Sequence, residues 1–500
     1  MSSSDIERPT VRFVHTISKS AGNYPSNSPV KFRGDSGLQD GNSTGTHDLV
    51  GGFYDSGNNI KFSFPTAYTH QKYTDIGELD HVKDIIKWDS DYLLKLFVPP
   101  NATFAAPILY SQASIHNYCT FVGSANNDSE NPNDINCCGR PEDMTYQRPA
   151  STCDITASDL AGEIVAALSA ASLVFKDDQA YSKDLVDAAE KLFELATNVD
   201  STKQGTYTMV DACGGEARNF CNSSGYLDEL IWGGTWLFFA TGNTSYLEDA
   251  TKRYDDAEKD KIPFDEGIFY WNNKFIANSV LLTRLQFFHD VGYPYEDALL
   301  SSSNLTDSVM CSYLSDQNFD KTHGGLILLK PDYDTPLHDY LDLLRRSGGM
   351  CSNDGFSVRL LTSFSMSQVN YILGDNPMKM SYMVGFGDHF PTQVHLRSSS
   401  IPWDNQHYSC AQGDRWLNSV DPNPNVLLGA MVTGPDQNDS FIDQRDKPQF
   451  TEPTISSNAG LVAALIALHD PPSISYDSNG FSFGIDQLGI FENIRIPTAP

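Results

Sequence analysis

The chain has 500 residues, longer than a typical single domain, although an all-helical barrel can use that length as one unit. Hydrophobic residues make up 40% of it and aromatic residues 11%, which is ample for a large core. The formal net charge of −30 argues against a nucleic acid partner, because phosphate binding needs clustered Lys and Arg. A cationic or neutral partner, such as an uncharged polysaccharide, is compatible with that charge.

Helical periodicity begins near residue 81, after a stretch rich in Gly, Ser, Asn and Asp that indicates loops. Residues 81–97 carry apolar side chains on one broad face and end before Pro99 and Pro100, which cannot continue a helix. The face consists of Val82, Ile85, Ile86, Leu93 and Leu96.

Further helices are predicted along the rest of the chain. Ser158 is the expected N-cap of an Ala-rich helix, and Ser182 the expected start of another. The second helix has a buried stripe of Leu185, Ala189, Leu192, Phe193 and Ala196. The remaining predicted helices span 226–240, 275–288, 356–373 (closed by Gly374) and 459–469.

Strand signals are few, and no linker divides the chain. We therefore expect one all-α domain over residues 1–480, followed by a C-terminal tail at 481–500.

Cysteines and glycosylation sequons indicate a secretory-pathway environment. Nine cysteines lack CxxC or zinc-ligand spacing, and seven Asn-x-Ser/Thr sequons are more than chance favours. The N-terminal residues have no signal-peptide core, and nowhere do eighteen apolar residues run together. Either the chain is cytosolic or its targeting segment lies outside this sequence, and we favour the second. The sequons lie at Asn42, Asn101, Asn127, Asn222, Asn243, Asn304 and Asn438.

The stretch LVGGFYDSGNNIKFSFP (49–65) places Asp55 in a turn beside Tyr54 and other aromatic residues. A carboxylate among aromatics can orient water beside a sugar ring. An Asx-turn that only caps a backbone bend explains the same residues equally well.

Two later stretches carry further candidates. His395 and Arg397 are two residues apart, so in extended backbone both can face one site. Asp443 and Glu452 lie in a polar loop just before the apolar helix at 459–469. Acid catalysis on a glycosidic bond needs one protonated and one ionised carboxyl, although loop carboxylates are more often solvated surface.

Other motifs exclude alternatives. GDSG (34–37) is similar to a serine-protease nucleophile turn, but it lies too near the N-terminus for a catalytic His to precede it in the protease order, and no all-β pattern surrounds it. The chain has no GxGxxG or Walker-type loop, which argues against a nucleotide enzyme.

These blocks, with KWDSDYLLK, CGRPEDM, FYWNNK, GYPYED and GAMVTGPDQNDSFIDQRD, resemble the plant-type endo-β-1,4-glucanases of glycoside hydrolase family 9. The resemblance spans almost the whole chain. RPEDMTYQRP, SDLAGEIVAAL and VMCSYL are most similar to the membrane-anchored KORRIGAN-type subgroup. The resemblance implies an (α/α)6 barrel with an open cleft for a β-1,4-glucan, and single-displacement hydrolysis with inversion.

The resemblance also implies roles for individual residues. Glu452 matches the general acid, and Asp443 matches a second carboxylate that organises the site. His395 and Arg397 match the His-x-Arg that contacts substrate, and Asp55 is expected beside the catalytic water. Tyr54, Asn58, Trp232 and Trp271 complete the expected substrate-binding set. It implies no organic cofactor, and no metal site can be selected.

The main departure concerns the catalytic base. The family turn is Asp-Ala-Gly-Asp, whereas this chain has Asp55-Ser-Gly-Asn58, so an amide stands at the base position. Asn cannot take a proton near neutral pH, and general-base assistance of roughly 10²–10⁴-fold should be lost. Asp55 is expected to substitute only partially.

Two stretches, between Tyr68 and Tyr73 and between Leu337 and Leu344, look compressed by about one helix each relative to the family. Three interpretations stay open: an active or weakly active glucanase, a glucan-binding or regulatory pseudoenzyme, and a poorly folding product of an imperfect gene model or splice form. We expect the first, an endo-1,4-β-glucanase acting as a monomer at the lumenal or extracellular face. Any membrane attachment would use an anchor outside this sequence.

Overall fold

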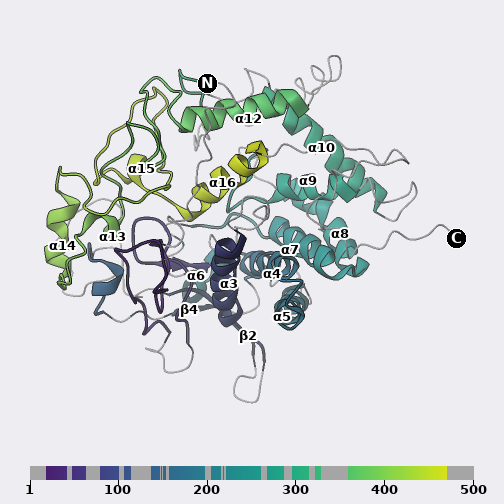
Figure 1. The fold of residues 1–500 in the computed structure, drawn as a ribbon. Helices are drawn as coiled ribbons and strands as arrows, with labels where there is room; N and C mark the ends of the chain where they lie inside the picture. Colours follow the sequence, from purple (N-terminus) through teal and green to yellow (C-terminus); the bar gives the residue numbers. More distant parts are fainter. Residues whose placement is uncertain are drawn as a thin grey trace.

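Helices dominate the computed structural model, which is drawn as a ribbon in Figure 1. It describes residues 18–41, 48–63, 79–100, 106–113, 137–146, 148, 150–153, 157–197, 204–214, 218, 221–260, 267–285, 295–314, 321–327 and 358–469.

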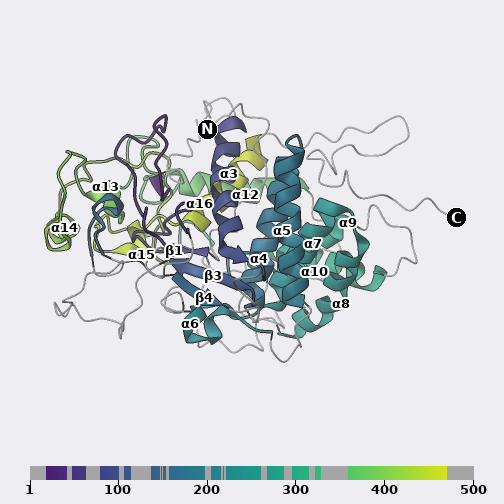
Figure 2. The ribbon, with the colours of Figure 1, turned by 90° about the horizontal axis from the view of Figure 1, so that it is seen from below.

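The longer helices come in chain order around the core (Figures 1 and 2). They are α3 (Leu79–Leu96), α4 (Ser158–Val174), α5 (Gln179–Thr197), α7 (Leu227–Thr241), α8 (Thr244–Asp260), α9 (Phe275–Leu285), α10 (Glu296–Leu314), α12 (Val358–Ile372) and α16 (Ile455–His469). Short helices are η2 (Pro141–Asp143), η4 (Tyr207–Met209), α6 (Asp211–Gly214), α13 (Arg397–Ser400), α14 (Cys410–Leu417) and α15 (Pro448–Thr451).

Helices α4 and α7 are buried over most of their length, because most of their residues are apolar or small. Glycines let their backbones touch. A Cβ on Gly162 would lie 2.4 Å from the Glu229 carbonyl oxygen, and a Cβ on Gly233 would lie 2.7 Å from the Gly162 carbonyl oxygen. Helix α7 ends at Gly242, whose φ of +70° suits glycine.

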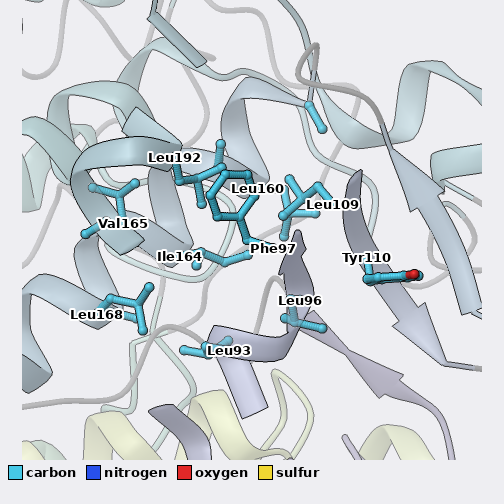
Figure 3. Close-up of a cluster of buried hydrophobic side chains, with 14 of the residues drawn as sticks. Leu93, Leu96, Phe97, Leu109, Tyr110, Leu160, Ile164, Val165, Leu168 and Leu192 are labelled. Carbon is cyan, nitrogen blue, oxygen red and sulfur yellow. The ribbon is translucent and has the colours of Figure 1, made fainter. Parts of the chain in front are cut away.

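Figure 3 shows the main core, where α4 packs against α3, α5 and the first strands. The predicted stripe of α5 is confirmed, since all five of its apolar side chains are buried. Fully burying one such Leu contributes roughly 1.5–3 kcal/mol. The labelled side chains are Leu93, Leu96, Phe97, Leu109, Tyr110, Leu160, Ile164, Val165, Leu168 and Leu192.

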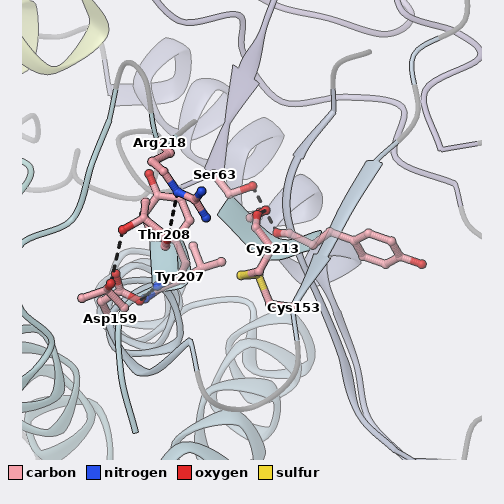
Figure 4. The surroundings of a disulfide bond; sticks show 11 residues. Ser63, Cys153, Asp159, Tyr207, Thr208, Cys213 and Arg218 are labelled. Atoms are coloured by element: carbon pink, nitrogen blue, oxygen red, sulfur yellow. Dashed lines mark hydrogen bonds between the residues drawn. A yellow bond between two sulfur atoms is a disulfide. The ribbon is translucent and has the colours of Figure 1, made fainter. Parts of the chain in front are cut away.

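A small antiparallel sheet lies beside this core. Strand β3 (Ile108–Ala113) pairs with β1 (Lys61–Phe62), β2 (Phe97–Val98) and β4 (Ala150–Cys153). The disulfide Cys153–Cys213 ties β4 to α6, and Figure 4 shows its surroundings. Strand β1 directly follows the turn that contains Asp55, so the sheet connects this turn to the helical core.

The C-terminal loops with α13, α14 and α15 lie beside the N-terminal loops in both views (Figures 1 and 2). The disulfide Cys137–Cys410 crosses between them, joining cysteines 273 residues apart. Arg140 adds a bond to the Pro402 carbonyl oxygen at 2.7 Å. Two segments that are far apart in the sequence are thus brought into one region.

Most predicted helices are confirmed, with corrections at their ends. The N-cap of α4 is Ala157 rather than Ser158, and α5 begins at Gln179 rather than Ser182. Helices α8 and α10 were not predicted, because their polar composition hides the apolar stripe. Both compressed stretches lie outside the described residues. Within the described part of the chain, no helix is both long and apolar enough to span a bilayer.

Candidate active site

Residues 55–60 form a closed turn. The Asp55 N–H donates to the Ile60 carbonyl oxygen at 2.9 Å, and the Ile60 N–H donates to Asn58 Oδ1 at 2.9 Å. Ser56 adopts a φ of +50° and donates its hydroxyl to Asp55 Oδ2 at 3.0 Å. The Asx-type bond predicted for this turn is therefore made by Asn58, which leaves the Asp55 carboxylate for another role.

Glu452 directly contacts this turn. It follows α15, and its Oε1 accepts the Gly57 N–H at 2.7 Å although the two residues are 395 positions apart. Its carboxyl is half-buried, and no other hydrogen bond to it occurs in the described part of the structure. The second oxygen of Glu452 is thus available to a ligand.

Gly57 permits the close approach of His395. A Cβ at position 57 would lie 2.2 Å from His395 Cδ2 and 2.6 Å from its carbonyl oxygen. His395 Nδ1 lies 2.6 Å from the Arg445 carbonyl oxygen, which can only accept, so Nδ1 carries the proton and Nε2 is an acceptor. Burial lowers the pKa of His395, whereas the Glu452 charge opposes that change.

Burial governs the electrostatics of Asp55. This residue is 7% exposed, and Oδ1 has no hydrogen-bond partner in the described structure. Burial raises the pKa of Asp55, the nearby Lys19 ammonium lowers it, and Glu452 raises it further. Asp55 and Glu452 therefore sense each other's charge, as expected if they serve one site.

Asp443 organises the loop that precedes His395. Its Oδ2 accepts the Thr392 N–H and hydroxyl, each at 2.8 Å, and its Oδ1 accepts the Gln393 N–H at 2.9 Å. These contacts support the predicted organising role, because they hold the loop that leads to His395.

Arg397 is the first residue of α13, two positions after His395, and its charge adds to burial in lowering the His395 pKa. Leu396 between them is buried in the core with an extended backbone. The alternation supports the prediction that His395 and Arg397 share one face.

The expected aromatic residues divide into two groups. Tyr54 is 1% exposed and packs near Arg33 and Arg148, so its ring has no surface for a sugar. The prediction that Tyr54 binds substrate is therefore wrong. Its buried ring instead packs inside the protein and supports the turn that follows it. Half-buried Trp232 packs against Trp236 and Phe269, and half-buried Trp271 against Tyr270. Sugar stacking by these two tryptophans stays a prediction.

Sequence reasoning missed Arg445 and Lys19. Buried Arg445 donates to Asn423 Oδ1 at 2.7 Å and to the carbonyl oxygens of Ser419 and Asp421, while its own carbonyl holds His395. The QRD run beside Asp443 was the only signal for Arg445 in the sequence. In the described ranges, no three His, Cys, Asp or Glu side chains are grouped to hold a metal ion.

The chain is similar to known proteins over most of its length. A family model described as "Glycosyl hydrolase family 9" matches residues 17–465. The chain belongs to this family. Endoglucanase 25 of Arabidopsis thaliana is 44% identical over 481 residues, which cover 90% of this chain and 74% of the relative. Endoglucanase 10 of rice is 41% identical, with 96% and 78% covered.

Solved family 9 structures confirm the predicted fold. The endoglucanase of the termite Nasutitermes takasagoensis aligns with a TM-score of 0.69 and 32% identity, covering 91% of this chain and 97% of its own. The cellulase Cel9M of C. cellulolyticum in complex with cellobiose aligns with a TM-score of 0.65 and 26% identity, covering 91% and 96%. The family 9 chain is therefore an (α/α)6 barrel.

Proposed function

We propose that this family 9 chain is an endo-1,4-β-glucanase that hydrolyses internal bonds of a cellulose-like glucan with inversion. The observation that carries the proposal is the bond from the Gly57 N–H to Glu452 Oε1, which joins the expected acid to the turn of Asp55. Relatives named as endoglucanases and a neighbour solved with cellobiose support the substrate class.

Glu452 serves as the general acid. With one oxygen fixed by the Gly57 N–H, the other donates a proton to the departing glycosidic oxygen. His395, a neutral donor–acceptor against the same turn, orients the sugar or the acid. Asp443 keeps the His395 loop in place through Thr392 and Gln393.

We assign to Asp55, the remaining carboxyl of this turn, the positioning of the attacking water and the acceptance of its proton; Oδ1 is buried, so the side chain must turn for the water to reach it. Asn58 cannot accept a proton, and its carbonyl oxygen is already engaged by the Ile60 N–H. We therefore expect slow turnover rather than none. The alternative of a glucan-binding protein without hydrolysis gains no support from the relatives, which carry endoglucanase names.

The product anomer tests the reaction. Proton NMR during hydrolysis of a cello-oligosaccharide should first show the α-anomer, because a single displacement inverts the β-linkage. Glu452→Gln should abolish turnover while cello-oligosaccharide binding persists. A first-formed β-anomer, or full activity of Glu452→Gln, would refute the mechanism.

We further propose a monomeric enzyme with one catalytic domain over residues 1–480 and a tail at 481–500. Its place is the lumenal or extracellular face, and its subgroup the membrane-anchored one, with an anchor outside this sequence. The disulfides Cys137–Cys410 and Cys153–Cys213 and the exposed sequons at Asn222, Asn243 and Asn438 support the compartment. A mobility shift on enzymatic deglycosylation of the native protein tests it, and an unshifted band would contradict it.

A further inference from the structure

Lys19 joins the two loops that carry the expected catalytic carboxyls. Its carbonyl oxygen accepts the N–H of Tyr54, the residue before Asp55, at 2.8 Å. Its Nζ donates to the carbonyl oxygen of Pro453, the residue after Glu452, at 3.4 Å. One residue thus contacts the immediate neighbours of both carboxyls.

The Lys19 ammonium is enclosed. The residue is 1% exposed, and the Pro453 carbonyl is its one hydrogen-bond acceptor in the described structure. A buried ammonium with a single neutral partner is costly, so it needs negative charge nearby. Burial lowers the pKa of Lys19 to about 8, against the opposing charges of Asp55 and then Glu452. The Arg33 guanidinium acts in the same direction as burial.

The backbone around Lys19 is fixed from the other side by Arg33. This buried guanidinium donates to the carbonyl oxygens of Ser18 and Ser20 on either side of Lys19, and its Nε donates to Glu142 Oε1 at 2.5 Å. Glu142 also accepts the Gly34 N–H at 3.1 Å. The main chain at Lys19 is therefore held in place, so Lys19 can fix the distance between the Asp55 turn and the Glu452 loop.

We propose that Lys19 is a positioning residue: its main-chain carbonyl binds the Asp55 turn, its ammonium binds the Glu452 loop, and the ammonium balances the charge of the two carboxyls whose spacing these bonds fix. This inference rests on the proposed glucanase function. A second buried lysine, Lys61, provides the contrast: it pairs with Asp40 at 2.7 Å and with the carbonyl oxygens of Leu49 and Gly51. Lys61 is a structural lysine, and these partners do not include the residues beside Asp55 or Glu452.

The experiment compares Lys19→Met, Lys19→Gln and Lys19→Arg with Lys61→Met, in the natural chain and in an Asn58→Asp background. Lys19→Met should lower kcat/KM for a soluble β-1,4-glucan by about tenfold or more, mostly through kcat. Both limbs of its pH–rate profile should move to higher pH by about one unit, because both carboxyls lose a neighbouring cation. Lys19→Arg should restore the profile, and Lys61→Met should lower stability without moving it.

A second readout does not depend on turnover. The Lys19 charge helps to lower the pKa of His395, along with burial and Arg397 and against Glu452. In histidine-labelled protein the His395 NMR titration should therefore move upward in Lys19→Met and Lys19→Gln but not in Lys61→Met. The Gln variant supplies this test if the Met variant does not fold.

Absence of hydrolysis in both backgrounds would refute the glucanase proposal, and the His395 titration would still decide the role of Lys19. An unmoved titration, or a pH–rate profile that only loses height, would overturn the positioning role and leave Lys19 as a structural residue like Lys61.

Discussion

Gly57 is the residue at which the catalytic loops meet. Its N–H binds Glu452, and the space where its side chain would stand is filled by His395. The hydrogen bond to Glu452 and the packing against His395 therefore both depend on this one position. Asn58, one residue later, uses its amide oxygen to close the turn rather than to touch Glu452.

Gly57→Ala should lower kcat/KM by about a hundredfold, because a methyl group must displace the His395 ring or backbone. The melting temperature should also fall, because the same Cβ would lie 2.6 Å from the His395 carbonyl oxygen, so activity is measured at a temperature at which the variant is folded. Gly460→Ala on α16, where a Cβ meets nothing within 4 Å, is the matched control and should keep full activity. Equal activity in both variants would contradict the assigned contact.

At the scale of elements, the crossing of α4 and α7 depends on glycine. Gly162→Ala should destabilise the fold by about 1–3 kcal/mol or more, because its Cβ would overlap the Glu229 carbonyl. Gly460→Ala should instead be neutral or stabilise α16 by up to about 1 kcal/mol. Chemical denaturation of the two variants measures the difference, and equal values would show that the helices can move apart freely.

The same helices bury carboxyls that respond to pH. Burial, reinforced by Asp228, raises the pKa of Glu229 well above its ordinary value, and burial raises those of Asp159 and Glu163 to about 7. The folded state thus holds protons that the unfolded state releases above about pH 4.5. Their contribution to stability is present at low pH and is lost as the pH rises through the folded-state pKa values.

Glu229→Gln should therefore raise the melting temperature at pH 8 more than at pH 5, by the equivalent of about 1 kcal/mol or more. Gln keeps the shape of Glu without an ionisable group. Scanning calorimetry at both pH values provides the measurement. A substitution effect that is the same at both pH values would show that Glu229 is not protonated in the folded state.

Amphipathic and apolar helices were predictable from the sequence, whereas contacts between distant loops were not. The α5 stripe follows from its period alone, and α4 and α7 from continuous small or apolar residues. Glu452, His395 and Asp55 were found by resemblance. The roles of Lys19 and Arg445 could not be predicted from the sequence, because a single lysine or arginine has no periodic signal. Their partners are also distant: Pro453 lies hundreds of residues from Lys19, and Asn423 lies on another loop from Arg445. The burial of Tyr54 also depends on tertiary packing.

At the scale of the whole molecule, the site exists because segments far apart in the sequence are joined. Cys137–Cys410 closes a long loop between them, and Arg140 and Arg33 add bonds across the same region. A paired Cys137→Ala/Cys410→Ala variant should lose about 2–5 kcal/mol of stability. Cys138→Ala, at the neighbouring free thiol, should lose about 1 kcal/mol or less. An equal loss of unfolding free energy in the two variants, measured by denaturant unfolding, would show that the disulfide does not stabilise the fold.

We propose that Glu452 and the Asp55–Asn58 turn form one hydrolytic site that lacks only a full-strength base. Asp at position 58 can still accept the Ile60 N–H while its second oxygen becomes a base. The decisive measurement is the initial rate of hydrolysis of a soluble β-1,4-glucan by the natural chain and by Asn58→Asp. We predict a slow natural rate and a gain of at least about tenfold, toward the 10²–10⁴-fold typical of a general base. Equal and rapid rates in the two proteins would contradict the claim.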